Sequence, residues 1–317
     1  MRHARLKPVS TDTFMHVYNR TVGTRVEFPF GDCEKDTFIS RLLKLTELYV
    51  VEVVAYQLMG NHFHVLVHVP GEAPSLEETA ARFNRYYPRK AAMKAESAAC
   101  ARLAPQLRDI SAFMKDLQQP FTRWFNRTRP IRRRGHLWAE RFKNTVLENG
   151  LAVWDCWKYI EMNPVRAHMV SDPADYRFCS FGHWSGVGRH PCAATVENRL
   201  LPWLRGLLGT ATLADVHQAL RVEFARIRAT EAGQLPGQIE AAMAAAGARE
   251  RFTTQLDRRV RYWVDGLVIG SEQFVRATMG RVRVAAQVQK RRLVRALAPT
   301  NARTDLFCFK QLRILLE

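Results

Sequence analysis

The sequence predicts an α+β protein, with a small antiparallel sheet in its first part and a mostly α-helical region after it. Three observations predict this class. Residues 13–69 read as strand, helix, strand, strand; residues 186–317 have helical hydrophobic spacing; and Gly186, Gly188 and Pro191 mark a change in composition between the two parts. The chain is 317 residues long and 47% hydrophobic, which is enough for about two domains.

The first four predicted elements follow from hydrophobic periodicity. Phe38, Leu42 and Leu45 recur on one helical face within residues 34–50. Strands are predicted at residues 13–22, 51–59 and 62–69, and the tight turn Gly60-Asn61 joins the last two. Strand, helix, strand, strand is the first half of a ferredoxin-like (RRM-like) split β-α-β unit.

The rest of the chain divides into an insertion, the end of a first domain and a second domain. Residues 71–107 are rich in Ala and in charge, and they predict a helical insertion. After it we expect a helix that is kinked or bounded at Pro120, a short strand and a helix ended by Pro164, at residues 110–126, 141–149 and 152–163. The predicted domains are residues 1–185 and a helical domain of residues 186–317, which serves DNA binding or assembly and includes a helix over residues 271–297.

The charge of the chain indicates a polyanionic partner. Lys and Arg number 48 against 30 Asp and Glu, which gives a formal net charge of +18. Nucleic acid is the commonest partner of such a chain, and a solubilising surface is the alternative. Because there is no run of ~18 apolar residues and no signal-peptide core, we expect no membrane association and a cytoplasmic, nucleoid-associated protein.

Two histidines interrupt an apolar strand. His62 and His64 are two positions apart, so their side chains project from the same face of the strand. Two imidazoles placed in this way can bind one divalent cation at ~2.1 Å. The alternative for each histidine is a hydrogen-bonded strand residue. His68 shares the face but lies too far along it to join the same ion.

A second motif, "KYIEMNPVRA" at residues 158–167, carries a tyrosine and an asparagine at helical spacing. Tyr159 and Asn163 are four residues apart and share one helix face. Pro164 disfavours helix at Asn163, so that amide is expected at the helix terminus, where its oxygen can serve as a third metal ligand. A metal-held phosphate beside Tyr159 would allow the phenol to attack phosphorus and form a phosphotyrosine ester.

These motifs resemble those of a known family. The segments "YQLMGNHFH", "FTRWFN…RRRGHLWAERFK" and "YIEMNPVRA" resemble the single-tyrosine HUH transposases, and most closely the REP-associated tyrosine transposases of bacteria, over about residues 12–185. The resemblance implies a ferredoxin-like HUH domain that cuts and rejoins single-stranded DNA beside a hairpin, with Mg²⁺ or Mn²⁺ as cofactor. His62 and His64 match the HUH ligands, Tyr159 the nucleophile and Asn163 the third ligand. Gly60 stands where many members have proline, and the compact members lack the insertion.

Residues 123–143 combine basic and aromatic side chains, a composition typical of single-strand binding. Arginines can hold phosphates while aromatic rings stack on bases, and the alternative is that the aromatics are core and the arginines solvated. The residues predicted to contact DNA are Arg123, Trp124, Arg127, Arg132, Arg133, Arg134, Arg141 and Lys143.

The predicted function is therefore a metal-dependent tyrosine transposase that acts on single-stranded or hairpin DNA as a monomer or homodimer. One alternative is a non-catalytic single-stranded DNA or RNA binding protein on an RRM-like sheet. A His-x-His metallohydrolase is less favoured, because the sequence lacks the barrel pattern and the acidic ligands of that class. The sequence leaves open the target hairpin and whether Tyr159 acts within its own subunit.

Overall fold

The chain forms two compact units, which are described separately. The computed structural model describes residues 11–24, 27–209, 212–246, 263, 266–285, 295–296 and 307–310. The N-terminal unit is Lys7–Lys143, and the C-terminal unit is Asn144–Glu317 with Met1–Leu6. The predicted α+β class, with an antiparallel sheet and a mostly helical C-terminal region, is confirmed.

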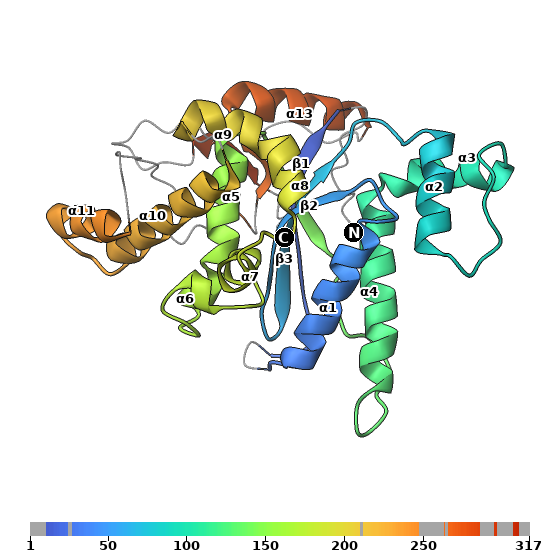
Figure 1. The fold of residues 1–317 in the computed structure, drawn as a ribbon, viewed down its shortest axis with the longest axis horizontal. Helices are drawn as coiled ribbons and strands as arrows, with labels where there is room; N and C mark the ends of the chain where they lie inside the picture. The colour runs from blue at the N-terminus through green and yellow to red at the C-terminus, as the bar shows by residue number, and fades with distance from the viewer. Residues whose placement is uncertain are drawn as a thin grey trace, which may run out of the picture. The chain divides into compact units, whose positions relative to one another are not determined.

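The N-terminal unit has the predicted strand, helix, strand, strand order. Its elements are β1 (Thr13–Arg20), α1 (Asp32–Leu45), β2 (Glu52–Leu58), β3 (His62–Val69), α2 (Leu76–Tyr86), α3 (Ala98–Leu107) and α4 (Ile110–Arg127). β3 lies between β1 and β2 and is antiparallel to both, while α1 connects the two outer strands (Figure 1). This is the arrangement of a split β-α-β unit.

Aromatic side chains join α1 and α4 to one face of this sheet. The Phe38 ring of α1 lies 4.9 Å from the Phe63 ring of β3 and 5.2 Å from the Phe121 ring of α4, between centroids. Trp138 packs edge-on against Phe63 at 5.4 Å. Because strand side chains alternate, His62 and His64 project from the opposite face.

Of the two expectations for Pro120, a kink or a helix boundary, the boundary is wrong. α4 continues through Pro120 as one helix from Ile110 to Arg127. Phe113, Leu117 and Phe121 of α4 are fully buried, so packing of the apolar face holds the helix despite the hydrogen bond that proline removes.

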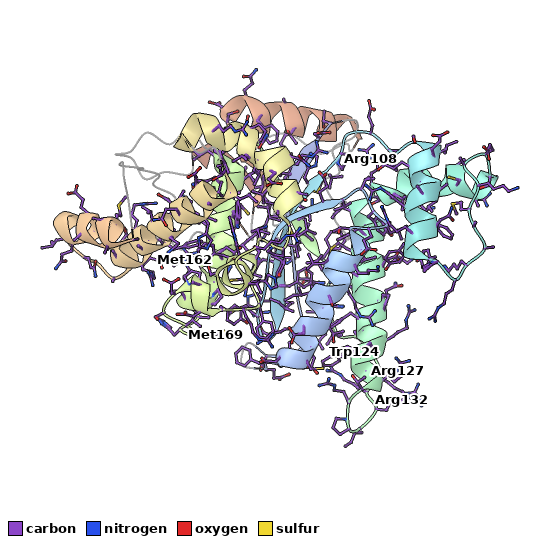
Figure 2. The ribbon with its side chains drawn as sticks, in the orientation of Figure 1. Arg108, Trp124, Arg127, Arg132, Met162 and Met169 are labelled. Carbon is purple, nitrogen blue, oxygen red and sulfur yellow. The ribbon has the colours of Figure 1, made fainter. Side chains whose placement is uncertain are left out.

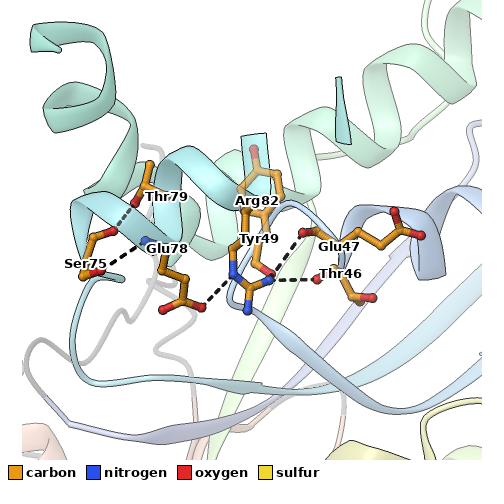
Figure 3. A network of polar contacts seen from close by, with 7 residues as sticks. All are labelled: Thr46, Glu47, Tyr49, Ser75, Glu78, Thr79 and Arg82. Atoms are coloured by element: carbon orange, nitrogen blue, oxygen red, sulfur yellow. Dashed lines mark hydrogen bonds and ion pairs between the residues drawn. The ribbon is translucent and has the colours of Figure 1, made fainter. Parts of the chain in front are cut away.

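The region predicted as a helical insertion contains α2 and α3, and Arg82 is one of the residues that join it to the loop before β2 (Figure 3). Arg82 of α2 donates from Nη1 to the carbonyl oxygens of Thr46 and Tyr49 at 3.2 and 3.0 Å. Its Nε also donates to Glu78 Oε1 at 2.8 Å. The carbonyls belong to the loop between α1 and β2, so α2 is docked on a defined backbone site.

The C-terminal unit is mostly helical and contains short strands. Its elements are β4 (Lys143–Leu147), α5 (Leu151–Glu161), α6 (Asn163–Arg166), η1 (Pro173–Asp175), α7 (Ser180–Val187), α8 (Ala193–Thr195), η2 (Val196–Leu200), α9 (Leu201–Leu208), α10 (Leu213–Glu231), α11 (Pro236–Ala245), β5 (Gly266–Gly270), α13 (Glu272–Ala285), β6 (Arg295–Ala296) and β7 (Phe307–Lys310). Of the helices in the described part of the chain, none combines the length and apolar character needed to cross a membrane.

Two features of this unit differ from the sequence-based expectations. The region after residue 186 is not helical throughout, because β5 pairs parallel with β4, Val146 opposite Val268, and antiparallel with β7. The compact units divide after Lys143, whereas the predicted boundary after residue 185 falls within α7. Helix α13 ends at Ala285. The prediction of helix as far as residue 297 is wrong at Arg295–Ala296, which form strand β6 and pair with β7, while residues 286–294 and 297 lie outside the described residues.

Candidate metal and tyrosine site

His62 and His64 lie next to each other on the sheet face opposite the aromatic core. Their ring centroids are 5.3 Å apart, with the ring planes at 88°. The strand that carries them begins directly after the Gly60-Asn61 turn. A Cβ atom at position 60 would lie 2.9 Å from Phe28 Cβ, so the exposed Phe28 would have to shift if another residue stood where this chain has glycine.

Each histidine ring is oriented by a hydrogen bond at Nδ1. His62 Nδ1 lies 2.7 Å from Asn61 Oδ1, and Asn61 in turn donates its Nδ2 to the carbonyl oxygen of Glu27. His64 Nδ1 lies 2.8 Å from Nε2 of His16 on β1. An imidazole held through Nδ1 binds a metal through Nε2, and such outer hydrogen bonds fix the ring orientation of metal-ligating histidines.

The surroundings keep both imidazoles neutral at neutral pH. Burial lowers the pKa of His62 to about 4, and the nearby Arg20 cation acts in the same direction. Burial also holds the pKa of His64 well below its ordinary value, assisted by His16 and His62. A neutral imidazole is the form that binds metal, so these two rings fit a divalent cation.

Sequence reasoning missed His16 and Gln57, which flank this pair. The His16 and His64 rings stack with centroids 5.0 Å apart. Gln57 of β2 is paired directly with His64 across the sheet, so both project from the same face. Each is a polar residue with apolar neighbours in its strand, Met15 and Val17 beside His16 and Leu58 after Gln57, which was the available signal.

Tyr159 and Asn163 lie in the C-terminal unit and are joined within it. Tyr159 belongs to α5, which ends at Glu161, and Asn163 begins α6. Asn163 donates its side-chain Nδ2 to the carbonyl oxygens of Tyr159 and Ile160, both at 3.1 Å. Because carbonyls only accept hydrogen bonds, the amide nitrogen must face the helix end and the amide oxygen faces away from it.

The Tyr159 ring is half-buried between an aromatic and a cationic side chain. It stacks on Trp263 with centroids 5.8 Å apart, and the Arg166 guanidinium lies 5.7 Å from its centroid. Arg166 also pairs with Glu231 of α10 at 2.9 Å. These contacts restrict the ring to one orientation.

Buried charges fix the other face of α5. Lys158, adjacent to Tyr159, pairs with Asp155 and with Glu223 of α10, each at 2.8 Å. Glu161 accepts hydrogen bonds from the Ser180 hydroxyl and the Phe181 backbone N–H at the start of α7. Burial raises the pKa of Glu161 to about 7, and those hydrogen bonds partly offset the rise.

The predicted site residues therefore fall into two pairs in different units. His62 and His64 lie in the N-terminal unit, and Tyr159 and Asn163 lie in the C-terminal unit. Within the described residues, no group of three or more His, Cys, Asp or Glu side chains could hold a metal ion. Among the described residues, His62 and His64 therefore stand as a pair and not as part of a larger group of His, Cys, Asp or Glu ligands.

The basic segment forms a loop closed at its base by Asn126. The Asn126 carbonyl oxygen accepts from the Arg133 backbone N–H, and Asn126 Nδ2 donates to the Gly135 carbonyl oxygen, both at 3.0 Å. Gly135 has φ +98°, a conformation that favours glycine. Figure 2 shows Arg127 and Arg132 at this end of α4. The loop thus presents its arginines from a defined backbone.

Most of the predicted DNA-contacting side chains are exposed. Arg133 and Trp124 are half-buried, and Lys143 pairs with Glu140 at 3.2 Å. The exposed ones are Arg123, Arg127, Arg132, Arg134, Arg141 and Lys143. Two of the neighbouring aromatics, Phe125 and Phe142, are buried core residues. Trp124 and Trp138 are half-buried, and Trp138 also donates its Nε1–H to the Thr122 hydroxyl at 3.0 Å.

Comparisons with known proteins found one kind of similarity. No protein-family model and no curated protein matches the sequence. Among solved structures, the chain is similar to a REP-associated tyrosine transposase bound to a REP hairpin. The two share 15% sequence identity and a TM-score of 0.39, over 59% of this chain and 87% of that one. At this level of similarity, the function must be argued from the residues of this chain.

Proposed function

We propose that the protein is a metal-dependent endonuclease and transposase that cleaves and rejoins single-stranded DNA at hairpin sequences through Tyr159. The observation that carries the proposal is the orientation of the histidine pair. His62 and His64 are adjacent, neutral at neutral pH and each held through Nδ1. A hydrogen-bonded structural role for two strand histidines does not require this shared arrangement.

The proposed metal is Mg²⁺ or Mn²⁺, held by His62, His64 and the Asn163 amide oxygen. When bound, the ion would orient a phosphate and polarise its P–O bonds. Asn163 is suited to this role because its amide nitrogen is engaged by the Tyr159 and Ile160 carbonyls, which directs its oxygen outward.

Tyr159 is the proposed nucleophile. Its phenolic oxygen attacks phosphorus, an ester bond between tyrosine and phosphorus forms, and the bond from phosphorus to one sugar oxygen breaks. The sugar leaves as a free hydroxyl, and attack of a hydroxyl on the phosphotyrosine ester rejoins a strand. Stacking on Trp263 and the nearby Arg166 cation hold the ring during these steps.

The loop between Asn126 and Gly135, called the arginine loop below, is the proposed contact with the DNA backbone. Arg132 and Arg134 are exposed on a loop closed by Asn126, and Arg127 is exposed at the end of α4, so all three can meet phosphates with little loss of backbone freedom. The same observation also favours a second candidate function, a non-catalytic protein that binds single-stranded DNA or RNA.

One experiment separates these two functions. The protein is incubated with a pool of hairpin-containing single strands and Mn²⁺, and covalent protein–DNA species are isolated under denaturing conditions and sequenced. Recovery of strands linked to protein at one position beside a hairpin supports the endonuclease. Strands that are retained under native conditions but never linked covalently support the binding protein and contradict the proposal.

A further inference from the structure

Gln57 is a fully buried side chain whose amide makes no hydrogen bond. Its exposed fraction is 0%, and neither Nε2 nor Oε1 has a partner. Folded proteins rarely retain such a group, because burial removes water from an amide that could make several hydrogen bonds. An unsatisfied buried amide is therefore a candidate contact for a ligand or ion, provided that its position places it beside other groups that could bind the same ligand.

The position of Gln57 indicates which ligand. Gln57 and His64 are directly opposite in the antiparallel pairing of β2 with β3, and opposite side chains on one face are neighbours. His62 lies two residues before His64 on β3, so its side chain projects from the same face. The amide thus lies beside the histidine pair, within the same sheet.

Two other polar side chains beside the pair, Asn61 and His16, make hydrogen bonds to it. Asn61 bonds to His62, and His16 bonds to His64. Gln57 differs from both because its amide has no hydrogen-bond partner. An apolar residue would suit this position, since Val53, Val54, Ala55 and Leu58 of β2 are all buried. A polar group kept at a cost to stability is typical of a functional site.

We propose that the Gln57 Oε1 atom is an oxygen ligand in the metal site formed with His62 and His64, an inference that rests on the function proposed above. Mg²⁺ and Mn²⁺ favour oxygen ligands, whereas two imidazoles alone suit softer ions. An amide oxygen supplies that preference from the sheet itself. It adds no negative charge, so it does not repel the phosphate of a DNA substrate.

The test measures Mn²⁺ affinity and thermal stability on the full chain without DNA. Gln57→Leu replaces the unsatisfied amide with an apolar side chain of similar size. It should raise the melting temperature of the metal-free protein and weaken Mn²⁺ binding by about 10- to 100-fold. Gln57→Glu keeps an oxygen ligand and should bind Mn²⁺ at least as tightly as wild type. Gln118→Leu is the matched control, because Gln118 lies on α4 and also has a buried Nε2 without a partner. It should leave Mn²⁺ affinity unchanged.

The outcomes separate this inference from the proposed function. A Gln57→Leu variant that binds Mn²⁺ like wild type, or that melts at a lower temperature without metal, overturns the inference. The function is judged by a different variant, His62→Ala. If wild type binds no Mn²⁺, or His62→Ala binds it as well as wild type does, the proposed metal site itself is wrong.

Discussion

The side-chain amide nitrogen of Asn163 donates a hydrogen bond to the carbonyl oxygen of Tyr159, at 3.1 Å. The proposed nucleophile and the proposed third metal ligand are therefore linked through one turn of backbone. Any change that removes this bond should alter both the end of α5 and the direction of the Asn163 oxygen.

Replacing Asn163 with Asp separates its two roles. A carboxylate cannot donate to the Tyr159 and Ile160 carbonyls and would be repelled by their oxygens, so the free energy of unfolding should fall by about 1–2 kcal/mol. The Asp oxygen can still bind metal. Asn163→Asp should therefore lose stability in urea denaturation but retain Mn²⁺ binding, while Asn163→Ala should lose both. An Asp variant as stable as wild type would show that the hydrogen bonds from Asn163 to the Tyr159 and Ile160 carbonyls do not stabilise the protein.

The arginine loop should contribute to the salt dependence of DNA binding. Replacing Arg132, Arg133 and Arg134 with Ala should reduce the slope of log affinity against log salt by up to about 2 for a single strand. The control replaces Arg189, Arg205 and Arg221, which are exposed and change the net charge equally. It should change the slope less. Equal effects of the two triple variants would show that only total charge matters.

The buried His190 should make the protein less stable in acid. Burial lowers its pKa to about 3 from an ordinary value near 6.5. Between those values the unfolded chain takes up a proton that the folded protein excludes, so stability falls as pH falls, by about 1.4 kcal/mol per pH unit.

His190→Asn provides the comparison for this prediction. The Asn oxygen can replace Nδ1 as acceptor of the Cys192 backbone N–H, but it does not titrate. The difference in unfolding free energy between wild type and variant should therefore change with pH between about 6 and 3.5. Glu161, with its raised pKa, acts in the opposite direction between 4.5 and about 7 and is present in both proteins. If the unfolding free energies of wild type and His190→Asn change with pH in parallel, the account of His190 as a buried neutral imidazole is wrong.

Arg82 should stabilise the docked insertion. Arg82→Met removes the donors to the Thr46 and Tyr49 carbonyls and the ion pair with Glu78, at a cost of about 2 kcal/mol in urea denaturation. Arg85→Met, at an exposed position of the same helix, should cost less than about 0.5 kcal/mol. Equal losses would mean that the contacts drawn in Figure 3 do not dock α2.

Local periodicity accounts for the parts of the fold that the sequence predicted. The strands of β1–β3, the amphipathic α1 and the helix that carries Tyr159 each have their own repeating pattern, so each could be read without the others. β5 could not be read in this way. Its run of five residues, "GLVIG", forms a strand through pairing with β4 about 120 residues earlier, and no local pattern encodes that partner.

The candidate site was predicted in part for the same reason. His62 and His64 share a strand, and Tyr159 and Asn163 share a helical turn, so spacing alone brings each pair together. His16 and Gln57 join the site only through the register of β1 and β2 with β3, which pairing between separate strands sets. Phe142 could not be assigned to core or DNA contact from composition, and the structure buries it.

The most direct test of the proposed function is strand cleavage by Tyr159→Phe with hairpin DNA and Mn²⁺. The substitution removes one oxygen and keeps the ring that stacks on Trp263, so folding and DNA affinity should stay close to wild type. Cleavage and the covalent protein–DNA species on a denaturing gel should both disappear. A Phe variant that still cleaves the hairpin strand at the wild-type rate would contradict the account, because the nucleophile would then be another residue or water.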